Sequence, residues 1–307
     1  MWGLLVLLAV AVGVVIVLGT AALSYLLARP PRLTLGRAMA MGLPTEPAEV
    51  DLAGESRTFD VTRRTRVPAF VLEGHAPDGP TVVMLHGLLE SRYASLARAP
   101  VLADHAARLV LPDLRGHGES SRSLGYGGTV EVDDTLAQIE QLDGEGDLVL
   151  HGFSLGAGTA IATGARLSDA AARGDRELKR WRLTGVIAEG AYRYWTTPLR
   201  EFLWFYRVPP WPFVPLLRLI HEPLNAGLRR YDRARDAARL NVPLRMLHGA
   251  DDWLCDVAHA RAIADAADDG RLIEMPKATH MDIATADPER YRAAIADFFH
   301  DFEPPRP

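Results

Sequence analysis

The chain has 307 residues, of which 48% are hydrophobic, 24% charged and 7% aromatic. Such a composition is typical of a globular protein with one or two domains, and it excludes collagen-like, low-complexity and wholly disordered chains. The 34 basic and 39 acidic residues give a formal charge of −5 without any long basic run, so we expect no nucleic-acid partner. Cys255 is the only cysteine, which excludes an internal disulfide and a zinc site built from several thiolates.

An uninterrupted apolar run opens the chain, from Trp2 to Ala28. As a helix it would be about 40 Å long, compared with a bilayer hydrocarbon core of about 30 Å. A cleaved signal peptide has a positive N-terminal region and a core of about 7–15 residues, whereas here no Lys or Arg precedes a run about twice that length. We therefore predict a retained transmembrane anchor over residues 1–28, which gives the protein membrane lipid as a partner.

Basic residues follow this run, whereas only the α-amine precedes it. The first of them are Arg29, Arg32 and Arg37. The positive-inside rule then places the remainder of the chain in the cytoplasm. Two consecutive prolines and further Gly and Pro residues predict a linker over residues 29–49.

Residues 50–303 alternate short β-branched runs with helical patterns. This alternation predicts one α/β domain with a mostly parallel central sheet and helices on both faces. We expect strands at 58–62, 67–72, 81–85, 108–111, 147–150, 184–188, 244–247 and 271–275. The first two would form an antiparallel hairpin and the others buried parallel strands. A last helix is expected to begin at Pro288, with Asp287 as its N-cap.

The segment 191–236 interrupts the alternation and is rich in aromatic residues. We interpret it as a cap inserted over the carboxyl edge of the sheet. Half or more of its rings should simply pack the underside of the cap. The others would roof a pocket for an acyl chain or another hydrophobic group, and the outer face of the cap would touch lipid.

The pattern G-x-S-x-G occurs at residues 152–156, directly after an expected strand and at the start of a helix rich in small residues. A serine on such a sharp turn adopts strained backbone angles, and the two glycines let strand and helix approach closely. The pattern therefore predicts that Ser154 is a nucleophile. The alternative is a tight structural turn that happens to contain serine.

A serine nucleophile needs a general base and a carboxylate that orients the base. His280 follows the expected strand at 271–275, and the pair Asp251 and Asp252 follows the strand at 244–247. Both positions lie at the carboxyl edge of the sheet, where open α/β sheets place catalytic groups. We assign His280 as the base and an aspartate of this pair as its partner.

The strand at 81–85 ends in His86, Gly87 and Leu88. This turn would aim the backbone N–H of Leu88 at the developing oxyanion, beside the N–H of Leu155. The two amides are our predicted oxyanion hole.

Four motifs follow one another along the chain: the His-Gly turn, the sequence Asp-Leu-Arg-Gly-His-Gly at 113–118, the G-x-S-x-G pattern, and Gly-x-x-Asp followed by a histidine. Over about residues 57–302 the chain resembles the α/β-hydrolase superfamily of serine esterases, lipases and peptidases. The resemblance implies the α/β-hydrolase fold with an inserted cap. It also implies Leu88 as an oxyanion donor, Asp252 rather than Asp251 as the acid, and a structural role for the loop at 113–118.

Departures from the superfamily's patterns narrow the resemblance. The run His-Gly-Gly-Gly is absent, which argues against the hormone-sensitive lipase branch. Serine at the turn argues against epoxide hydrolases and haloalkane dehalogenases, which use aspartate there. We expect no metal at Asp251, Asp252 and Asp256, because triad hydrolysis needs none and Asp256 reads as a helix N-cap.

The predicted function is a membrane-anchored serine hydrolase without a cofactor. It would cleave a carboxylic ester or related acyl bond of a hydrophobic small molecule through an acyl-enzyme. A thioesterase or small-peptide hydrolase would use the same residues. A non-catalytic membrane-tethered scaffold that uses the cap as a binding surface is the alternative of another class.

Overall fold

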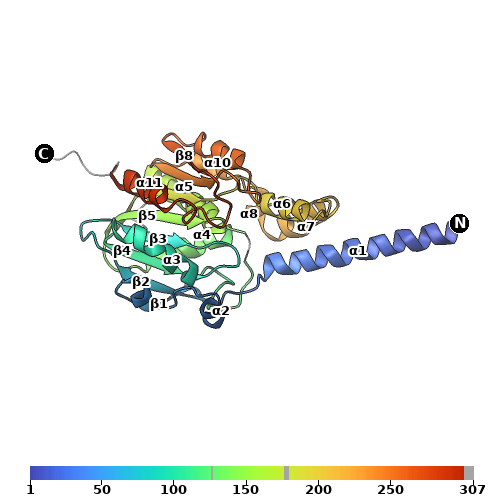
Figure 1. Cartoon of the computed structure of the whole chain (residues 1–307), viewed down its shortest axis with the longest axis horizontal. Coiled ribbons are helices and arrows are strands. Elements are labelled where there is room, and N and C mark those ends of the chain that lie inside the picture. Colours follow the sequence, from blue (N-terminus) through green and yellow to red (C-terminus); the bar gives the residue numbers. More distant parts are fainter. Residues whose placement is uncertain (126, 176–179, 301–307) are drawn as a thin grey trace.

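A computed structural model describes residues 1–125, 127–175 and 180–300 of the chain (Figure 1). The end of the predicted domain, at 301–303, lies outside the described residues. The strands are β1 (Gly54–Thr62), β2 (Thr65–Glu73), β3 (Thr81–Leu85), β4 (Arg108–Pro112), β5 (Gly146–Phe153), β6 (Trp181–Glu189), β7 (Leu244–Gly249) and β8 (Gly270–Met275). The helices are α1 (Trp2–Ala28), α2 (Leu35–Ala40), η1 (Pro47–Val50), α3 (Arg92–Ala103), α4 (Val130–Glu140), α5 (Leu155–Arg173), α6 (Thr197–Phe205), α7 (Phe213–Leu224), α8 (Ala226–Arg229), α9 (Arg233–Ala237), α10 (Val257–Ala264) and α11 (Pro288–His300).

All eight strands join one sheet in the order β1-β2-β4-β3-β5-β6-β7-β8. The β1–β2 and β2–β4 pairs are antiparallel and the remaining pairs are parallel, so the predicted hairpin and mostly parallel sheet are confirmed. Alternate residues of β3 enter two separate cores: Val83 and Leu85 pack with α4, α5 and α10, whereas Val82 and Met84 pack with α3 and α11. The sheet therefore has helices on both faces, as predicted.

Two predicted helix N-caps are present. The Asp287 carboxylate accepts the N–H of Arg290 at 3.1 Å, and α11 begins at Pro288. Asp256 caps α10 and accepts the N–H of Ala258 at 2.7 Å. The Asp256 side chain therefore has a structural role as the N-cap of α10.

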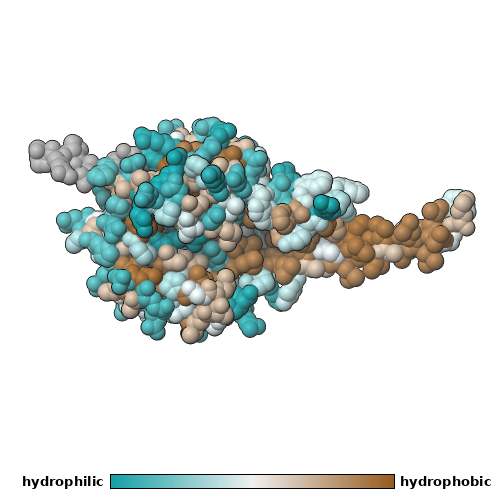
Figure 2. All heavy atoms as spheres, viewed as in Figure 1, coloured by the Kyte–Doolittle hydropathy of each residue, from teal (hydrophilic) through white to brown (hydrophobic). Residues whose placement is uncertain are grey.

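Helix α1 has the bounds of the predicted apolar run and extends away from the sheet (Figure 1). Thr20 is its one buried residue, so α1 is not a core helix of the domain. The hydrophobic surface of α1 continues onto the domain beneath the cap helices (Figure 2).

The segment predicted as a linker is folded against the domain. Leu33 and Ala38 are buried in the core that contains α3. The Arg32 guanidinium donates to the carbonyl oxygen of His117 at 3.1 Å and also to that of Ser120. The prolines and glycines of this segment therefore shape an ordered path, and α1 is attached to the domain by specific contacts.

Residues 191–236 lie between β6 and β7 and contain α6, α7, α8 and most of α9. Leu199, Leu203 and Leu217 of α6 and α7 pack against Leu23 and Leu27 near the end of α1. One polar contact crosses the same interface: Ser24 Oγ lies 2.9 Å from His221 Nε2. The segment predicted as a cap therefore contacts α1 directly.

Candidate active site

Ser154 lies at a sharp turn between β5 and α5. Its φ of 51° and ψ of −110° are costly for a residue with a side chain, by about 1–3 kcal/mol. The backbone carbonyl of Glu189 on β6 helps to hold the turn, because it accepts the Ser154 N–H at 2.7 Å. A β-carbon at Gly156 would overlap the carbonyl oxygen of Leu85, and one at Gly152 would overlap the backbone of α5. The two glycines are therefore required by close backbone packing, as the motif predicts.

Three predicted side chains meet in series. Ser154 Oγ lies 2.9 Å from His280 Nε2, and His280 Nδ1 lies 2.7 Å from Asp252 Oδ2. All three residues are buried. Because a carboxylate only accepts, His280 carries its proton on Nδ1 and presents the Nε2 lone pair to the serine hydroxyl. This is the tautomer that a general base requires.

The structure also separates the two candidate aspartates. Asp252 is buried, and its second oxygen accepts the N–H groups of Leu254 at 2.9 Å and Cys255 at 2.8 Å. Asp251 is exposed at the same turn. Asp252, which the resemblance favoured, is therefore the aspartate in contact with His280.

His248 on β7 is a further neighbour of Asp252. Its Nε2 lies 2.6 Å from the Cys255 carbonyl oxygen and 3.2 Å from Asp252 Oδ2. Since a carbonyl only accepts, Nε2 carries the proton, and a second N–H dipole faces the Asp252 carboxylate. Burial lowers the pKa of His248, with Asp252 opposing this shift.

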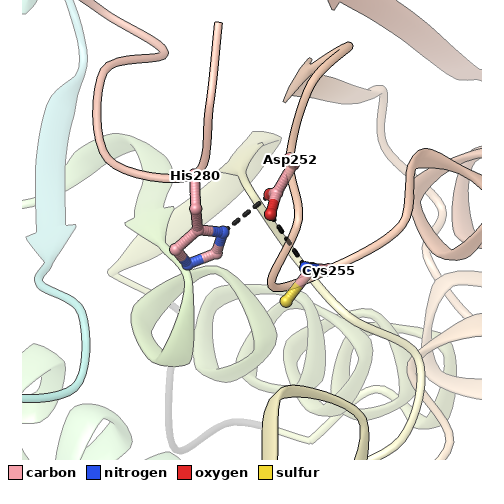
Figure 3. A group of neighbouring side chains, drawn as sticks. All are labelled: Asp252, Cys255 and His280. Atoms are coloured by element: carbon pink, nitrogen blue, oxygen red, sulfur yellow. Dashed lines mark hydrogen bonds and ion pairs between the residues drawn. The ribbon is translucent and has the colours of Figure 1, made fainter. Parts of the chain in front are cut away.

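Asp252, Cys255 and His280 lie close enough to raise the question of a metal site (Figure 3). The donor chemistry does not fit one. Both Asp252 oxygens already accept hydrogen bonds, and Figure 3 shows the carboxylate turned toward the His280 ring. Burial raises the pKa of the Cys255 thiol well above its ordinary value, so the sulfur stays protonated and is a poor ligand.

Leu88 and Leu155, the predicted oxyanion donors, both line the cavity that contains Ser154 and His280. Within the described part of the chain, neither backbone N–H donates to another protein oxygen. The turn that carries Leu88 is held by the Glu90 carboxylate, which accepts the Gly87 N–H at 2.8 Å. Both amides therefore lack an acceptor among the described residues, which the predicted oxyanion hole requires.

A buried charged network beneath the site has no signal in the sequence motifs. Glu189 Oε1 accepts from Tyr291 at 2.6 Å and lies 2.7 Å from His151 Nε2. Burial alone would raise the pKa of Glu189, but the charges of His151 and Arg98 hold it below its ordinary value.

Arg98 is the centre of this network, because it lies 3.7 Å from Glu189 and 3.7 Å from Glu90. It therefore connects the two segments that contain the predicted oxyanion donors: Glu90 holds the Gly87 turn, and the Glu189 carbonyl holds Ser154. Its guanidinium also covers the Phe153 ring, 4.4 Å from the centroid.

Ser154 opens into a mainly apolar cavity of about 1070 Å³. This volume slightly exceeds the roughly 300–1,000 Å³ found for most small-molecule sites. Its wall includes Trp195, Leu199 and Phe202 of the cap and also Leu23 and Leu27 of α1. The predicted cap thus contributes to a pocket above the serine.

Comparison with known proteins agrees with this fold. Residues 80–173 match the family model described as alpha/beta hydrolase fold. An esterase from Pyrococcus furiosus superimposes with a TM-score of 0.67 at 19% identity, over 90% of this chain and 98% of the esterase. A hydrolase from Rhodococcus that acts on 2-hydroxy-6-oxo-6-phenylhexa-2,4-dienoate superimposes with a TM-score of 0.58 at 18% identity, over 81% and 99% of the two chains. These comparisons show that the chain has the α/β-hydrolase fold.

Two further similarities extend the comparison. A membrane phospholipase A, described as a bacterial virulence factor, has a TM-score of 0.57 at 19% identity and covers 98% of both chains. A 2-succinyl-6-hydroxy-2,4-cyclohexadiene-1-carboxylate synthase from Yersinia pseudotuberculosis is 39% identical over 87 residues, which are 28% of this chain and 31% of the synthase. The chain thus aligns with about a third of the length of this curated relative.

Proposed function

We propose that the protein is a membrane-anchored serine hydrolase that cleaves a carboxylic ester, or a related acyl bond, of a hydrophobic substrate. The observation that carries this proposal is the series Ser154, His280 and Asp252 at hydrogen-bond distances beneath an apolar cavity. A thioester would enter the same cavity, but nothing in the site favours it over an ester.

The proposed reaction proceeds through an acyl-enzyme. Ser154 Oγ attacks the acyl carbonyl carbon while His280 Nε2 takes the hydroxyl proton, and Asp252 stabilises the imidazolium. The carbonyl oxygen becomes an oxyanion that accepts from the N–H groups of Leu88 and Leu155. His280 then gives its proton to the leaving alkoxide, and the acyl-oxygen bond to the alcohol breaks. In the second half, His280 Nε2 takes a proton from water as the water oxygen attacks the acyl carbon. His280 then returns this proton to Ser154 Oγ as the acyl-serine bond breaks and the carboxylic acid leaves.

Labelling with a fluorophosphonate tests the nucleophile. We expect the full-length protein to be labelled on Ser154 and to hydrolyse p-nitrophenyl butyrate, and we expect the Ser154→Ala variant to do neither. Ser168, a buried serine on the same helix, provides the matched control, because Ser168→Ala should keep both properties. Labelling that persists in Ser154→Ala, or a wild-type protein that is never labelled, would support the scaffold alternative.

The membrane attachment has its own support. Helix α1 is apolar, exposed and long enough to span a bilayer, and Arg29, Arg32 and Arg37 follow it. We propose that α1 is a retained anchor and that the domain faces the cytoplasm. Protease added to sealed inside-out vesicles should then digest the domain, whereas protease added to right-side-out vesicles should leave it intact. The reverse pattern would place the domain on the other side, and release of the domain by carbonate washing would indicate cleavage of α1.

A further inference from the structure

Helix α1 does more than lie beside the domain, because its last turns form part of the wall of the catalytic cavity. Leu23, Leu26 and Leu27 line the same cavity as Ser154 and His280. Their spacing of i, i+3 and i+4 places them on one face of the helix. Ser24, between them in sequence, instead contacts His221 on α7.

The depth of these leucines in a bilayer follows from helix geometry. A hydrocarbon core of about 30 Å is spanned by about 20 residues, which from Trp2 extends to about residue 21. Leu23 to Leu27 would then lie at the membrane–water interface, where the ester groups of lipids lie. The part of α1 that lines the cavity would therefore lie at the same depth in the bilayer as the ester groups of the lipids.

The exposed aromatic residues of the cap are also typical of a surface that lies at the membrane–water interface. Trp204, Tyr206 and Trp211 are exposed by 58%, 61% and 75%, and Phe213 of α7 lies against Gly19 of α1. Exposed Trp and Tyr side chains are enriched at membrane interfaces, where the ring enters the apolar layer and the polar atom stays hydrated. Phe213 also packs in the apolar cluster that contains Leu23 and Leu27 of α1.

We infer that α1 is a wall of the substrate site as well as an anchor, and that the substrate is a long-chain acyl ester taken sideways from the leaflet next to the domain. The acyl chain lies along the face of α1 that carries Leu23 and Leu27, and the carbonyl carbon lies at Ser154. This inference rests on the proposed function and names the substrate class of that site.

A pair of tryptophan variants tests whether α1 forms a wall of the substrate site. Leu27→Trp places a large ring at the cavity face of α1, whereas Leu18→Trp places the same ring at an exposed position outside the cavity. In phosphatidylcholine vesicles, we expect Leu27→Trp to lower the ratio of p-nitrophenyl palmitate to p-nitrophenyl acetate turnover at least tenfold. Leu18→Trp should keep the wild-type ratio. An unchanged ratio in Leu27→Trp, or an equal loss in both variants, would overturn the inference.

A crosslinking experiment determines the path of the acyl chain in the wild-type protein. A long-chain alkyl fluorophosphonate with a terminal diazirine is attached to Ser154 in vesicles and then photolysed. We expect crosslinks on residues 23–27 of α1, identified by mass spectrometry, and crosslinks confined to the hydrolase domain would contradict the proposed path. If the phosphonate fails to label Ser154 and p-nitrophenyl acetate is not hydrolysed, the proposed function itself has failed.

The leaflet source is tested with a dipalmitoyl glycerolipid ester that does not exchange between vesicles. Hydrolysis is expected when the ester and the protein share a bilayer. An ester confined to protein-free vesicles in the same suspension should remain intact. Equal hydrolysis of both populations would indicate that the substrate arrives from water.

Discussion

Asp251 and Asp252 are adjacent in the chain but have very different surroundings. Asp252 is buried against His280, whereas Asp251 is exposed. Replacing Asp252 by Asn should favour the wrong tautomer of His280 and lower kcat by about 10⁴-fold. Asp251→Asn removes the same charge one position away and should keep kcat within a few-fold of wild type. The measurement is turnover of p-nitrophenyl butyrate, and equal losses in both variants would contradict the assignment of the acid.

Arg98 is expected to act as a positioning residue. Replacing it by Met removes the cation between Glu90 and Glu189 and should loosen both segments that contain the predicted oxyanion donors. We expect kcat per fluorophosphonate-titrated site to fall about 10- to 100-fold, since small displacements at a reacting centre have effects of this size. KM should change little, and Arg98→Lys should recover part of the rate.

Titrating the active sites separates this effect from a loss of folded protein, which is expected because the variant removes the cation that lies between Glu90 and the buried Glu189. Arg166→Met, which removes an exposed arginine of α5, is the matched control and should retain the wild-type rate. If Arg98→Met lowers the number of titrated sites but not the rate per site, Arg98 serves stability alone.

The site residues with local signals could be found in the sequence, and those held by distant contacts could not. Ser154 lies in a five-residue pattern whose glycines have a backbone reason, and His280 follows a strand of the predicted order. Glu189 and Arg98 carry no such signal, because their importance comes from meeting each other across 91 positions of sequence. The choice of Asp252 over Asp251 likewise needed the superfamily pattern.

At the scale of elements, the strand-to-helix turn leaves no room for a side chain at Gly156. A methyl group there would overlap the Leu85 carbonyl of the neighbouring strand, so β5, α5 or β3 would have to move. We expect Gly156→Ala to lower the free energy of unfolding by about 1–3 kcal/mol or more. Gly36→Ala on α2 meets no atom within 4 Å and should leave stability unchanged or slightly raised. Thermal unfolding of the detergent-solubilised protein compares the two, and similar melting temperatures would contradict the packing argument.

Strand positions were predictable from β-branched runs, but strand ends were less so. β6 begins at Trp181 rather than at 184, because its first three residues continue the pairing with β5. Arg182 forms an ion pair with Asp147 at 2.7 Å across the two strands. The hydropathy pattern does not indicate such an ion pair. The apolar part of β6 could therefore be predicted from the sequence, but the end of the strand that contains Arg182 could not.

At the scale of the whole molecule, acid should destabilise the fold in a defined range. Burial lowers the pKa of His117 from 6.5 to about 4, although the hydrogen bond to the Arg115 carbonyl opposes this shift. Between pH 6.5 and 4, His117 is therefore protonated in the unfolded chain but neutral in the folded protein. Stability is full above pH 6.5 and decreases as the pH falls toward 4, by about 3 kcal/mol for this residue.

Unfolding of the full-length protein in detergent, followed from pH 7.5 to 4.5, measures this dependence. We expect His117→Gln to show a smaller decrease than wild type over that range. Part of the decrease should remain, because burial also lowers the pKa of His86 well below its ordinary value. Superimposable pH profiles for the two proteins would show that His117 does not contribute.

The arrangement of α1 on the domain is a property of the whole chain that the sequence did not predict. The sequence indicated an apolar helix, a linker and a cap as separate parts. The contact of Ser24 with His221 joins positions 197 residues apart, and the burial of Leu33 turns the linker into packed structure. These contacts depend on three-dimensional complementarity and leave no periodic pattern.

The Arg32 contacts with the His117 and Ser120 carbonyls leave only a short connection between α1 and the hydrolase domain. If α1 is the membrane anchor proposed above, the enzyme can reach only the lipid molecules that surround its own helix, whereas an enzyme on a long flexible linker could reach a wider area of the bilayer. Its encounter rate is then set by two-dimensional diffusion. Diluting the ester with inert amphiphile at constant bulk concentration should slow turnover in proportion to the surface mole fraction.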